Sequence, residues 1–302
     1  MRVLLTGGTG LIGRGVVRAL LERGDTVVCV TRDRKRALSR LPRPVEIVEA
    51  DPTRPGPWQA AAADSDAVVN LAGEPIAGGR WSRARKRRLR ESRLAVTRLL
   101  AEALAVAERP AVVVSASAVG YYGDGGREPL YEERGPGGGF LGRLAHEWEG
   151  AILPVESAGK RVVRLRIGVV LSRDGGALPR LLLPYRLFVG GPLGNPRAYF
   201  PWIHIHDLVR AVLFCLDRDD LAGPVNAVAP DPPTQKEFAA TLGRVLGRPA
   251  ALTVPSPLLR LVLGEMAESV LASLRAVPKA LRAREFSFVY RDLETALRDL
   301  LA

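Results

Sequence analysis

The residues with the most specific chemistry form a glycine-rich run near the start of the chain, Thr6-Gly7-Gly8-Thr9-Gly10-Leu11-Ile12-Gly13. Gly7 permits a tight turn, Gly10 lets the backbone approach a diphosphate, and Gly13 permits close packing of a helix on a strand. An apolar segment precedes the run and a helical pattern follows it, so the amides of Leu11 and Ile12 would face the phosphates at a helix N-terminus. The run therefore predicts a dinucleotide-binding turn, the alternative being a glycine turn with a purely structural role.

The second strand-like segment indicates which dinucleotide binds. An acidic residue at the end of this strand would hold the ribose 2′-hydroxyl of NAD. The sequence instead reads Thr31-Arg32-Asp33-Arg34-Lys35-Arg36. Arg32 stands where the acid is expected, with Arg34 and Lys35 beside it, and a guanidinium can pair with a 2′-phosphate through two hydrogen bonds. We therefore expect NADP(H), although the same residues would also suit a solvated helix start with Asp33 as its N-cap.

Two further segments follow predicted strands and are expected to line the cofactor. Asp51 follows the third strand, where its carboxylate would reach the adenine amino group or, alternatively, form a turn before Pro52. Asn70-Leu71-Ala72-Gly73 follows the fourth strand, at a point where the backbone would approach the cofactor. Both segments are expected at the carboxyl ends of parallel strands, the edge at which ligands bind in sheets of this type.

The elements that must position these residues alternate along the chain. Short apolar runs at 2–6, 26–31, 45–49, 67–71, 111–115 and 161–167 are separated by helical patterns. This alternation predicts an α/β fold, a Rossmann-type doubly wound parallel sheet with helices on both faces, and a smaller, mostly helical C-terminal lobe. Residues 1–168 would form the dinucleotide-binding domain, to which 200–230 return. Residues 169–199 and 231–302 would form the substrate-binding lobe.

Composition narrows the function classes. The chain has 302 residues, 47% of them hydrophobic and 25% charged, as in a globular protein with a large core. Its 44 Lys and Arg exceed its 32 Asp and Glu, and the resulting charge of +12 suits an anionic ligand. No apolar run approaches the roughly 18 residues of a membrane span, so no membrane partner is expected. Cys29 and Cys215 lie far apart, which predicts neither disulfide framework nor metal site, and a reducing, cytoplasmic location.

The chain resembles the short-chain dehydrogenase/reductase superfamily, in its extended, sugar-nucleotide-epimerase-like branch. The resemblance rests on the glycine turn and on four later motifs: Asn70-Leu71-Ala72-Gly73, Ser115-Ala116-Ser117-Ala118-Val119-Gly120-Tyr121-Tyr122-Gly123, Leu165-Arg166-Ile167-Gly168-Val169-Val170 and Trp202-Ile203-His204-Ile205-His206-Asp207-Leu208. More narrowly, the chain resembles an atypical "epimerase family" subgroup with a C-terminal domain of unknown function and no assigned substrate. The resemblance implies that Ser115, Ile167, Gly168 and Val169 also line the cofactor.

The chain departs from this superfamily in its catalytic residues. Reductases of the superfamily use a Tyr-x-x-x-Lys pair, in which the tyrosine transfers the substrate proton and the lysine lowers the tyrosine pKa. None of the six tyrosines here has a lysine four residues later. We expect Ser117, Tyr121 or Tyr122 to handle the proton instead. Ser117 lies near the position of the superfamily's catalytic Ser/Thr, although it would otherwise be a strand-end hydroxyl bonded to backbone.

These features predict an NADP-dependent oxidoreductase or epimerase-like enzyme that acts on a small anionic substrate as a monomer or homodimer. Arg80, Trp81, Arg93 and Trp202 would contact the substrate. The stretch 80–98 is rich in arginine and could instead be a solvated helix face; a nucleic-acid surface is disfavoured because no aromatic residues are interleaved. The missing Tyr-Lys pair leaves a second function open, that of a catalytically silent NADP-binding protein with a regulatory or redox-sensing role.

Overall fold

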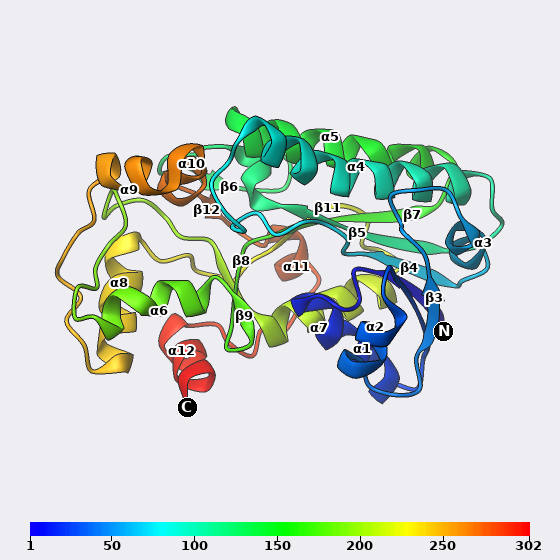
Figure 1. Cartoon of the computed structure of the whole chain (residues 1–302), viewed down its shortest axis with the longest axis horizontal. Coiled ribbons are helices and arrows are strands. Elements are labelled where there is room, and N and C mark those ends of the chain that lie inside the picture. Colours follow the sequence, from blue (N-terminus) through cyan, green and yellow to red (C-terminus); the bar gives the residue numbers. More distant parts are fainter.

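The central feature of the molecule is a parallel sheet between two layers of helices (Figure 1). The structure, a computed structural model, describes all 302 residues. The seven strands lie in the order β11-β7-β5-β4-β1-β2-β3. They are β1 (Arg2–Thr6), β2 (Thr26–Thr31), β3 (Glu46–Glu49), β4 (Ala67–Asn70), β5 (Val112–Ala118), β7 (Arg161–Ile167) and β11 (Gly223–Ala227). The predicted Rossmann-type fold is confirmed, and its switch in strand order falls between β1 and β4, where such sheets bind ligands.

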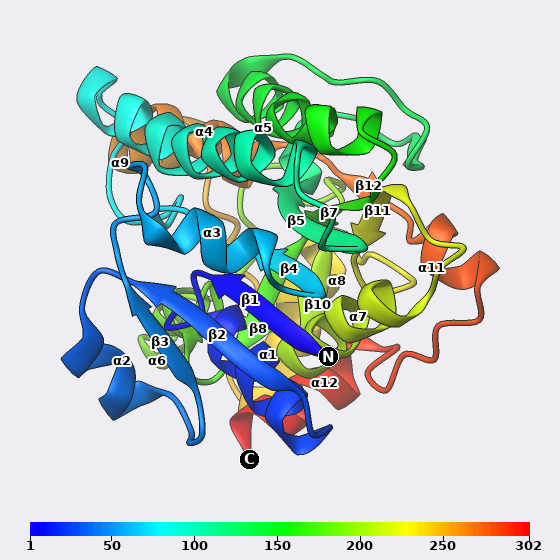
Figure 2. The same ribbon diagram turned by 90° about the vertical axis from the view of Figure 1, so that its right-hand side faces the viewer.

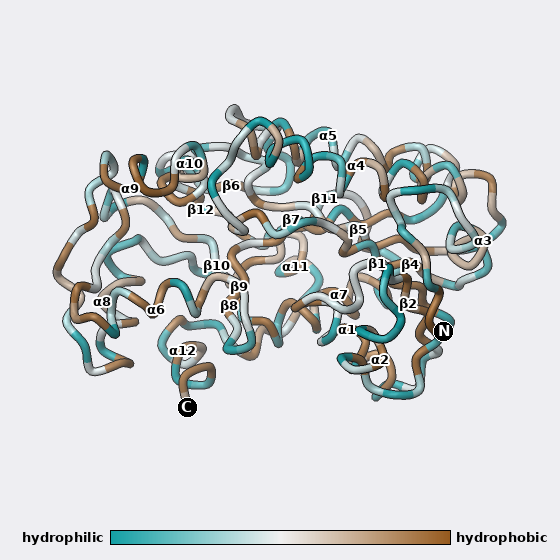
Figure 3. Tube along the Cα trace, viewed as in Figure 1, coloured by the Kyte–Doolittle hydropathy of each residue, from teal (hydrophilic) through white to brown (hydrophobic).

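Helices cover both faces of the sheet, which is why strands such as β1 and β2 are apolar along most of their length. Figure 2 shows one layer above the sheet and one below it. The first layer contains α3 (Pro57–Ala63), α4 (Arg83–Ala105) and α5 (Gly139–Ser157), and the second contains α1 (Leu11–Glu22), α2 (Arg34–Arg40) and α7 (Ile205–Asp217). Each layer has its own buried core, and hydrophobic stretches of the tube in Figure 3 run through the region of the strands between the layers.

The strand β5 continues to Ala118, three residues beyond the end at 115 that the sequence indicates. Its last residues stay in the sheet through pairing with β7, which places Ser117 opposite Arg166 and Ala118 opposite Ile167. Ser117 therefore lies inside the sheet, and the short 3₁₀ helix η1 (Val119–Tyr122) follows directly. This extension decides where the hydroxyl groups of the candidate site point.

The C-terminal lobe begins where the chain leaves β7. Gly168 sits at this passage, and a Cβ there would lie 2.9 Å from the Pro201 carbonyl oxygen. A second sheet follows, in the order β10-β8-β9, with β8 (Val169–Ser172), β9 (Gly175–Gly176) and β10 (Trp202–His204). A two-stranded ladder pairs β6 (Pro129–Leu130) with β12 (Arg275–Ala276). No helix of the structure has both the length and the apolar character needed to cross a membrane.

Helices make up most of this lobe, and three of them, at 178–186, 235–246 and 293–301, pack around a separate buried cluster that includes Leu178, Tyr185, Phe238 and Leu297. The helices are α6 (Leu178–Arg186), α8 (Gln235–Leu246), α9 (Ser256–Leu263), η2 (Gly264–Met266), α10 (Ala267–Leu271), α11 (Lys279–Ala283) and α12 (Leu293–Leu301). The strand β9 reaches back to the first helix of the main domain, since a Cβ at Gly176 would lie 3.1 Å from the Leu11 side chain. The lobe thus touches the start of α1, where the glycine-rich run lies.

Candidate functional site

The glycine-rich run connects β1 to α1 in a turn that has no room for side chains. Gly7 has a φ of 74°, which disfavours other residues, and a Cβ there would lie 2.7 Å from the Leu71 carbonyl. A Cβ at Gly13 would lie 2.3 Å from the Gly7 carbonyl oxygen, so this glycine lets the first turn of α1 pack on the loop. Gly10 is the N-cap of α1 and offers no side chain to its amides.

Three amides at the start of α1 are therefore available to a ligand. The amide of Gly10 donates to Gly7, and that of Arg14 donates to Gly10, but those of Leu11, Ile12 and Gly13 have no acceptor in the protein. The first turn of α1 carries no acidic residue. Free amides and the positive end of the helix dipole bind phosphate groups, so this turn fits a diphosphate.

Basic residues follow β2, as expected. Arg32 is exposed, and its guanidinium has neither a hydrogen-bond acceptor nor a carboxylate partner. Asp33 is turned away from the strand end, because its carboxylate caps α2 by accepting the Arg36 amide hydrogen at 2.8 Å. Arg34 donates to the Ile47 carbonyl at 3.1 Å, and the Lys35 side chain is exposed. Asp33 is thus engaged at its own helix, while Arg32 is available.

Asp51 is half-buried in the loop after β3. One of its carboxylate oxygens, Oδ1, accepts hydrogen bonds from the amide and the hydroxyl of Thr53, at 3.0 and 2.7 Å. The second oxygen, Oδ2, has no partner in the protein. The two expectations for Asp51, a turn and an adenine contact, are therefore compatible with each other.

The Asn70-to-Gly73 segment lies against the glycine turn, although the Asn70 side chain points away from solvent. Asn70 is fully buried. Its Oδ1 accepts the Thr6 hydroxyl at 2.7 Å, and its Nδ2 donates to Thr97 at 3.0 Å and to Ser115 at 3.3 Å. Asn70 and Ser115, both predicted cofactor residues, are thus joined to each other in the core. Only the backbone of this segment, from Leu71 onward, faces the turn.

A buried polar cluster lies behind the end of β5 and contains two residues for which the sequence predicts no role, Glu149 and Arg166. Arg166 donates from Nε and Nη2 to the two carboxylate oxygens of Glu149, at 2.8 and 2.9 Å. Ser117 donates its hydroxyl hydrogen to Glu149 at 2.7 Å. Although burial alone would lower the pKa of Arg166, the pairing with Glu149 raises it above its ordinary value. Arg166 therefore remains charged in the core.

The two candidate tyrosines have different surroundings. The Tyr122 hydroxyl donates to Asn226 at 2.7 Å and accepts from Arg166 at 3.0 Å, and burial raises the pKa of Tyr122 to about 12. The Tyr121 ring stacks on the same guanidinium, whose carbon lies 3.6 Å from the ring centroid. The Tyr121 hydroxyl has no hydrogen-bond partner in the protein. Of the three predicted proton-transfer residues, Ser117 and Tyr122 use their hydroxyl hydrogens internally and Tyr121 does not.

The predicted substrate residues are not brought together on one surface. Arg80 is exposed. Trp81 is buried, its ring nitrogen donates to the Ile76 carbonyl at 3.1 Å, and its ring meets Phe140 edge-on. Arg93 is buried and donates to the carbonyls of Leu89 and Glu74, at 3.0 and 2.9 Å.

Trp202 is fully buried in the core of the lobe. Because Trp202 is buried, it has no exposed surface for a ligand. The Arg93 side chain donates a hydrogen bond to the Glu74 carbonyl, in the loop after Gly73, and is buried there. Ile167, Gly168 and Val169 stand where the main sheet passes to the lobe. No group of three or more metal-ligating side chains is arranged to hold a metal ion.

Comparisons with known proteins agree with this architecture. A family model described as the NAD dependent epimerase/dehydratase family matches residues 3–138, and one described as a domain of unknown function (DUF1731) matches residues 254–300. The "Epimerase family protein SDR39U1" of Mus musculus is 39% identical over 310 residues, which cover 100% of both chains. The chain belongs to the epimerase family. A further member, from Staphylococcus epidermidis, is 38% identical over 304 residues and 99% of both chains.

A solved member of the epimerase family has the same structure. The human epimerase family protein SDR39U1 (isoform 2), crystallised with NADPH, superposes with a TM-score of 0.86. It is 34% identical, and the match covers 99% of each chain. The expectation of NADP(H) from Arg32 and its neighbours therefore agrees with the cofactor in this epimerase family structure, and the expected family resemblance is confirmed.

Proposed function

We propose that this chain is an NADP(H)-binding member of the short-chain dehydrogenase/reductase superfamily that acts as an oxidoreductase or epimerase-like enzyme on a small anionic substrate. The observation that carries the cofactor assignment is the contrast between two adjacent residues after β2. Arg32 has no partner, whereas Asp33 is engaged as the cap of α2. A 2′-phosphate would meet an available guanidinium there, and a 2′-hydroxyl would meet no available carboxylate.

Each part of the cofactor has residues suited to it. The amides of Leu11, Ile12 and Gly13 would hold the diphosphate, and Arg32, helped by Lys35, would hold the 2′-phosphate. The free oxygen of Asp51 would accept the adenine amino hydrogen. The backbones of 71–73 and 167–169 would line the remainder of the molecule. When bound, the nicotinamide ring supplies or accepts a hydride.

Proton transfer is assigned to Tyr121 within this proposal. A group that transfers a proton must reach the substrate and must have a hydrogen to give. The Ser117 and Tyr122 hydroxyls donate to Glu149 and Asn226, so they position the cluster instead. The Arg166 guanidinium carbon lies 3.6 Å from the centroid of the Tyr121 ring, so a positive charge stands against the ring of the proposed proton-transfer residue.

A second function is favoured by the same cluster. With no Tyr-Lys pair, and with two of three candidate hydroxyls engaged in the core, the chain also suits a catalytically silent NADP-binding protein with a regulatory role. Incubation of the protein and NADPH with a panel of carbonyl compounds separates the two. Oxidation of NADPH with any of them supports the enzyme, whereas tight NADPH binding with no oxidation across the panel supports the silent protein.

The cofactor assignment is tested by titrating NADPH and NADH into the protein and following nicotinamide fluorescence. Arg32→Ala is expected to weaken NADPH binding by roughly tenfold or more, because a charge-assisted hydrogen bond to phosphate is lost, and to leave NADH binding unchanged. Arg40→Ala, at the exposed far end of α2, is the matched control and should bind NADPH normally. Equal affinity of the unmodified protein for both dinucleotides would contradict the NADP(H) assignment, and binding of neither would remove the whole proposal.

A further inference from the structure

A polar cavity of about 280 Å³ lies apart from the cofactor residues, where three segments distant in sequence meet. One wall is the loop that begins two residues after Tyr122, another is the chain before β10, and the third is the end of α10 with the residues after it. The lining residues are Asp124, Gly126, Arg127, Asn195, Arg197, Ala198, Leu271 and Ser273. The cavity therefore joins the segment matched by the epimerase/dehydratase model to the segment matched by the C-terminal model. Such junctions between parts of a fold are favoured places for small-molecule sites.

Hydrogen bonds hold the three walls in one arrangement. Asp124 Oδ1 accepts the amide hydrogens of Gly126 and Ser273, at 3.2 and 3.0 Å. The Ser273 hydroxyl donates to the Gly126 carbonyl and accepts the Tyr199 amide hydrogen at 3.0 Å. The Asn195 side chain accepts the Arg197 amide hydrogen at 3.0 Å through Oδ1, so its Nδ2 hydrogens remain available. The cavity is thus a built feature and not a gap between independent loops.

The charges that line the cavity are predominantly positive. Arg127 and Arg197 come from different walls, both are exposed, and neither guanidinium has a carboxylate or carbonyl partner in the protein. The only acidic group in the lining is Asp124, whose Oδ1 already accepts two amide hydrogens. Arg275, just beyond the cavity, lies over the Tyr199 ring at 5.2 Å and likewise has no carboxylate partner. Two guanidiniums with free donors in the lining of one cavity attract an anionic oxygen group.

We propose that this cavity binds the phosphate or carboxylate group of a small anionic ligand, with Arg127 and Arg197 as its charged contacts and the Asn195 amide as a further donor. The inference deepens the proposed function, since the ligand would be the substrate or a group of it. The cavity shares no residue with the glycine turn, Arg32 or Asp51, so the anion it binds is not a cofactor phosphate.

The test uses the whole protein saturated with NADPH, so that the cofactor's own phosphate sites are filled. Inorganic phosphate and succinate are titrated separately by calorimetry at constant ionic strength. We expect at least one of the two probes to bind with a measurable heat. The probe that binds more tightly shows whether the site prefers phosphate or carboxylate. The double variant R127Q/R197Q should weaken this binding by roughly tenfold or more, because two charge-assisted contacts are lost. The control R43Q/R291Q removes the same charge at exposed arginines elsewhere and should bind the probes unchanged.

Asp124→Asn is a second, independent variant, which should strengthen probe binding where R127Q/R197Q weakens it. The amide oxygen of asparagine can still accept the Gly126 and Ser273 hydrogens, so the walls should hold while the negative charge disappears. Probe binding should then become tighter. The proposal is overturned if neither probe binds, or if binding persists in R127Q/R197Q. If NADPH itself fails to bind, the proposed function falls, but the probe titrations of these variants still decide the cavity.

Discussion

Arg166 in β7 and Glu149 in α5 form a doubly hydrogen-bonded ion pair inside the molecule, with both side chains less than a tenth exposed. The pair links β5, β7 and α5, because Ser117 donates to the same carboxylate and the Tyr121 and Tyr122 rings lie against the same guanidinium. Reductases of the superfamily keep a catalytic Tyr-Lys pair, whereas here the ionic group is enclosed and its role is to hold other residues.

Breaking the buried pair should be costly. Glu149→Gln leaves the Arg166 charge without a counter-charge in the core, and we expect a loss of about 3–5 kcal/mol in the free energy of unfolding. The matched control is Glu147→Gln, two residues earlier on α5, which breaks the exposed pair with Arg90 and should cost less than about 1 kcal/mol. Urea denaturation of both variants measures the difference. Similar losses in the two would show that the buried charge is not held as described.

The glycine turn should tolerate no added methyl group. In Gly13→Ala the new Cβ would lie 2.3 Å from the Gly7 carbonyl oxygen, which is backbone and cannot move aside. We expect destabilisation of about 1–3 kcal/mol and loss of NADPH binding. Gly150→Ala is the control, since it is also a helical glycine but has no atom within 4 Å of the added Cβ. It should stabilise the protein by about 0.5–1 kcal/mol and bind NADPH normally.

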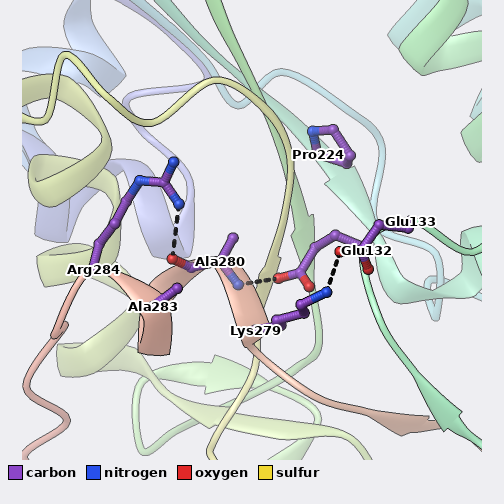
Figure 4. Close-up of a pocket in the computed structure, with 7 residues that line it drawn as sticks. All are labelled: Glu132, Glu133, Pro224, Lys279, Ala280, Ala283 and Arg284. Carbon is purple, nitrogen blue, oxygen red and sulfur yellow. Dashed lines mark hydrogen bonds and ion pairs between the residues drawn. The ribbon is translucent and has the colours of Figure 1, made fainter.

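Glu132, shown in Figure 4, should make the protein less stable as the pH rises, which is the opposite of the effect of most carboxyl groups in folded proteins. Its Oε1 accepts the amide hydrogens of Asn226 and Ala280, at 3.1 and 3.0 Å, while Oε2 is buried without a partner. Burial raises the pKa of Glu132 above its ordinary value, although those amides oppose the shift. Between the unfolded-state pKa of about 4.3 and the raised folded-state pKa, Glu132 therefore binds more protons in the folded protein than in the unfolded chain. The stabilisation that the protonated Glu132 contributes is present at low pH and is lost as the pH rises through the folded-state pKa.

Glu132→Gln keeps the accepting oxygen and removes the charge, so its stability relative to the unmodified protein should increase from pH 4 to pH 8. The neighbouring Glu133 provides the control, because its hydrogen bond with Lys279 lowers its pKa. Glu133→Gln should remove a small stabilisation, which is present above the unfolded-state pKa of Glu133 and disappears as the pH falls. Denaturation curves at several pH values measure both variants. A Glu132→Gln difference that does not depend on pH would refute this account of the buried carboxyl.

The two adjacent tyrosines should separate stability from catalysis. Tyr122→Phe leaves the Asn226 side-chain oxygen without its donor and should cost about 1–3 kcal/mol, with little effect on turnover beyond that of lost stability. Tyr121→Phe removes a hydroxyl with no partner, so its stability should change by less than about 0.5 kcal/mol. If Tyr121 transfers the proton, turnover should fall by about a hundredfold or more. Thermal unfolding and NADPH oxidation are measured for both, and full activity in Tyr121→Phe would exclude its role.

The sequence predicted those features that depend on local pattern. Alternating apolar runs and helical patterns indicated the parallel sheet, and the spacing of Gly7, Gly10 and Gly13 indicated the turn, because both properties are set by neighbouring residues. The Arg166–Glu149 pair was not predicted. It depends on the register between β5 and β7 and on the packing of α5, and neither leaves a periodic signal in the sequence.

Side-chain direction was the second property that sequence could not provide. The motif containing Tyr121 and Tyr122 was recognised, but the inward turn of one hydroxyl follows from the position of Asn226 in β11, about a hundred residues away. Arg93 and Trp202 were assigned from their motifs, and their burial follows from tertiary packing. The run Arg161–Ile167 contains three arginines among its apolar residues, and only Arg166 is buried, a difference that the sequence alone does not indicate.

The capping role of Asp33 has a consequence for protein engineering. A change to NADH use requires an acid after the second strand, because a carboxylate there holds the ribose 2′-hydroxyl of NAD. Here the neighbouring Asp33 already caps the first turn of α2, so altering it would destabilise the helix that carries Lys35 by about 1 kcal/mol. A redesign must therefore install a new carboxylate at position 32 and leave its neighbour intact.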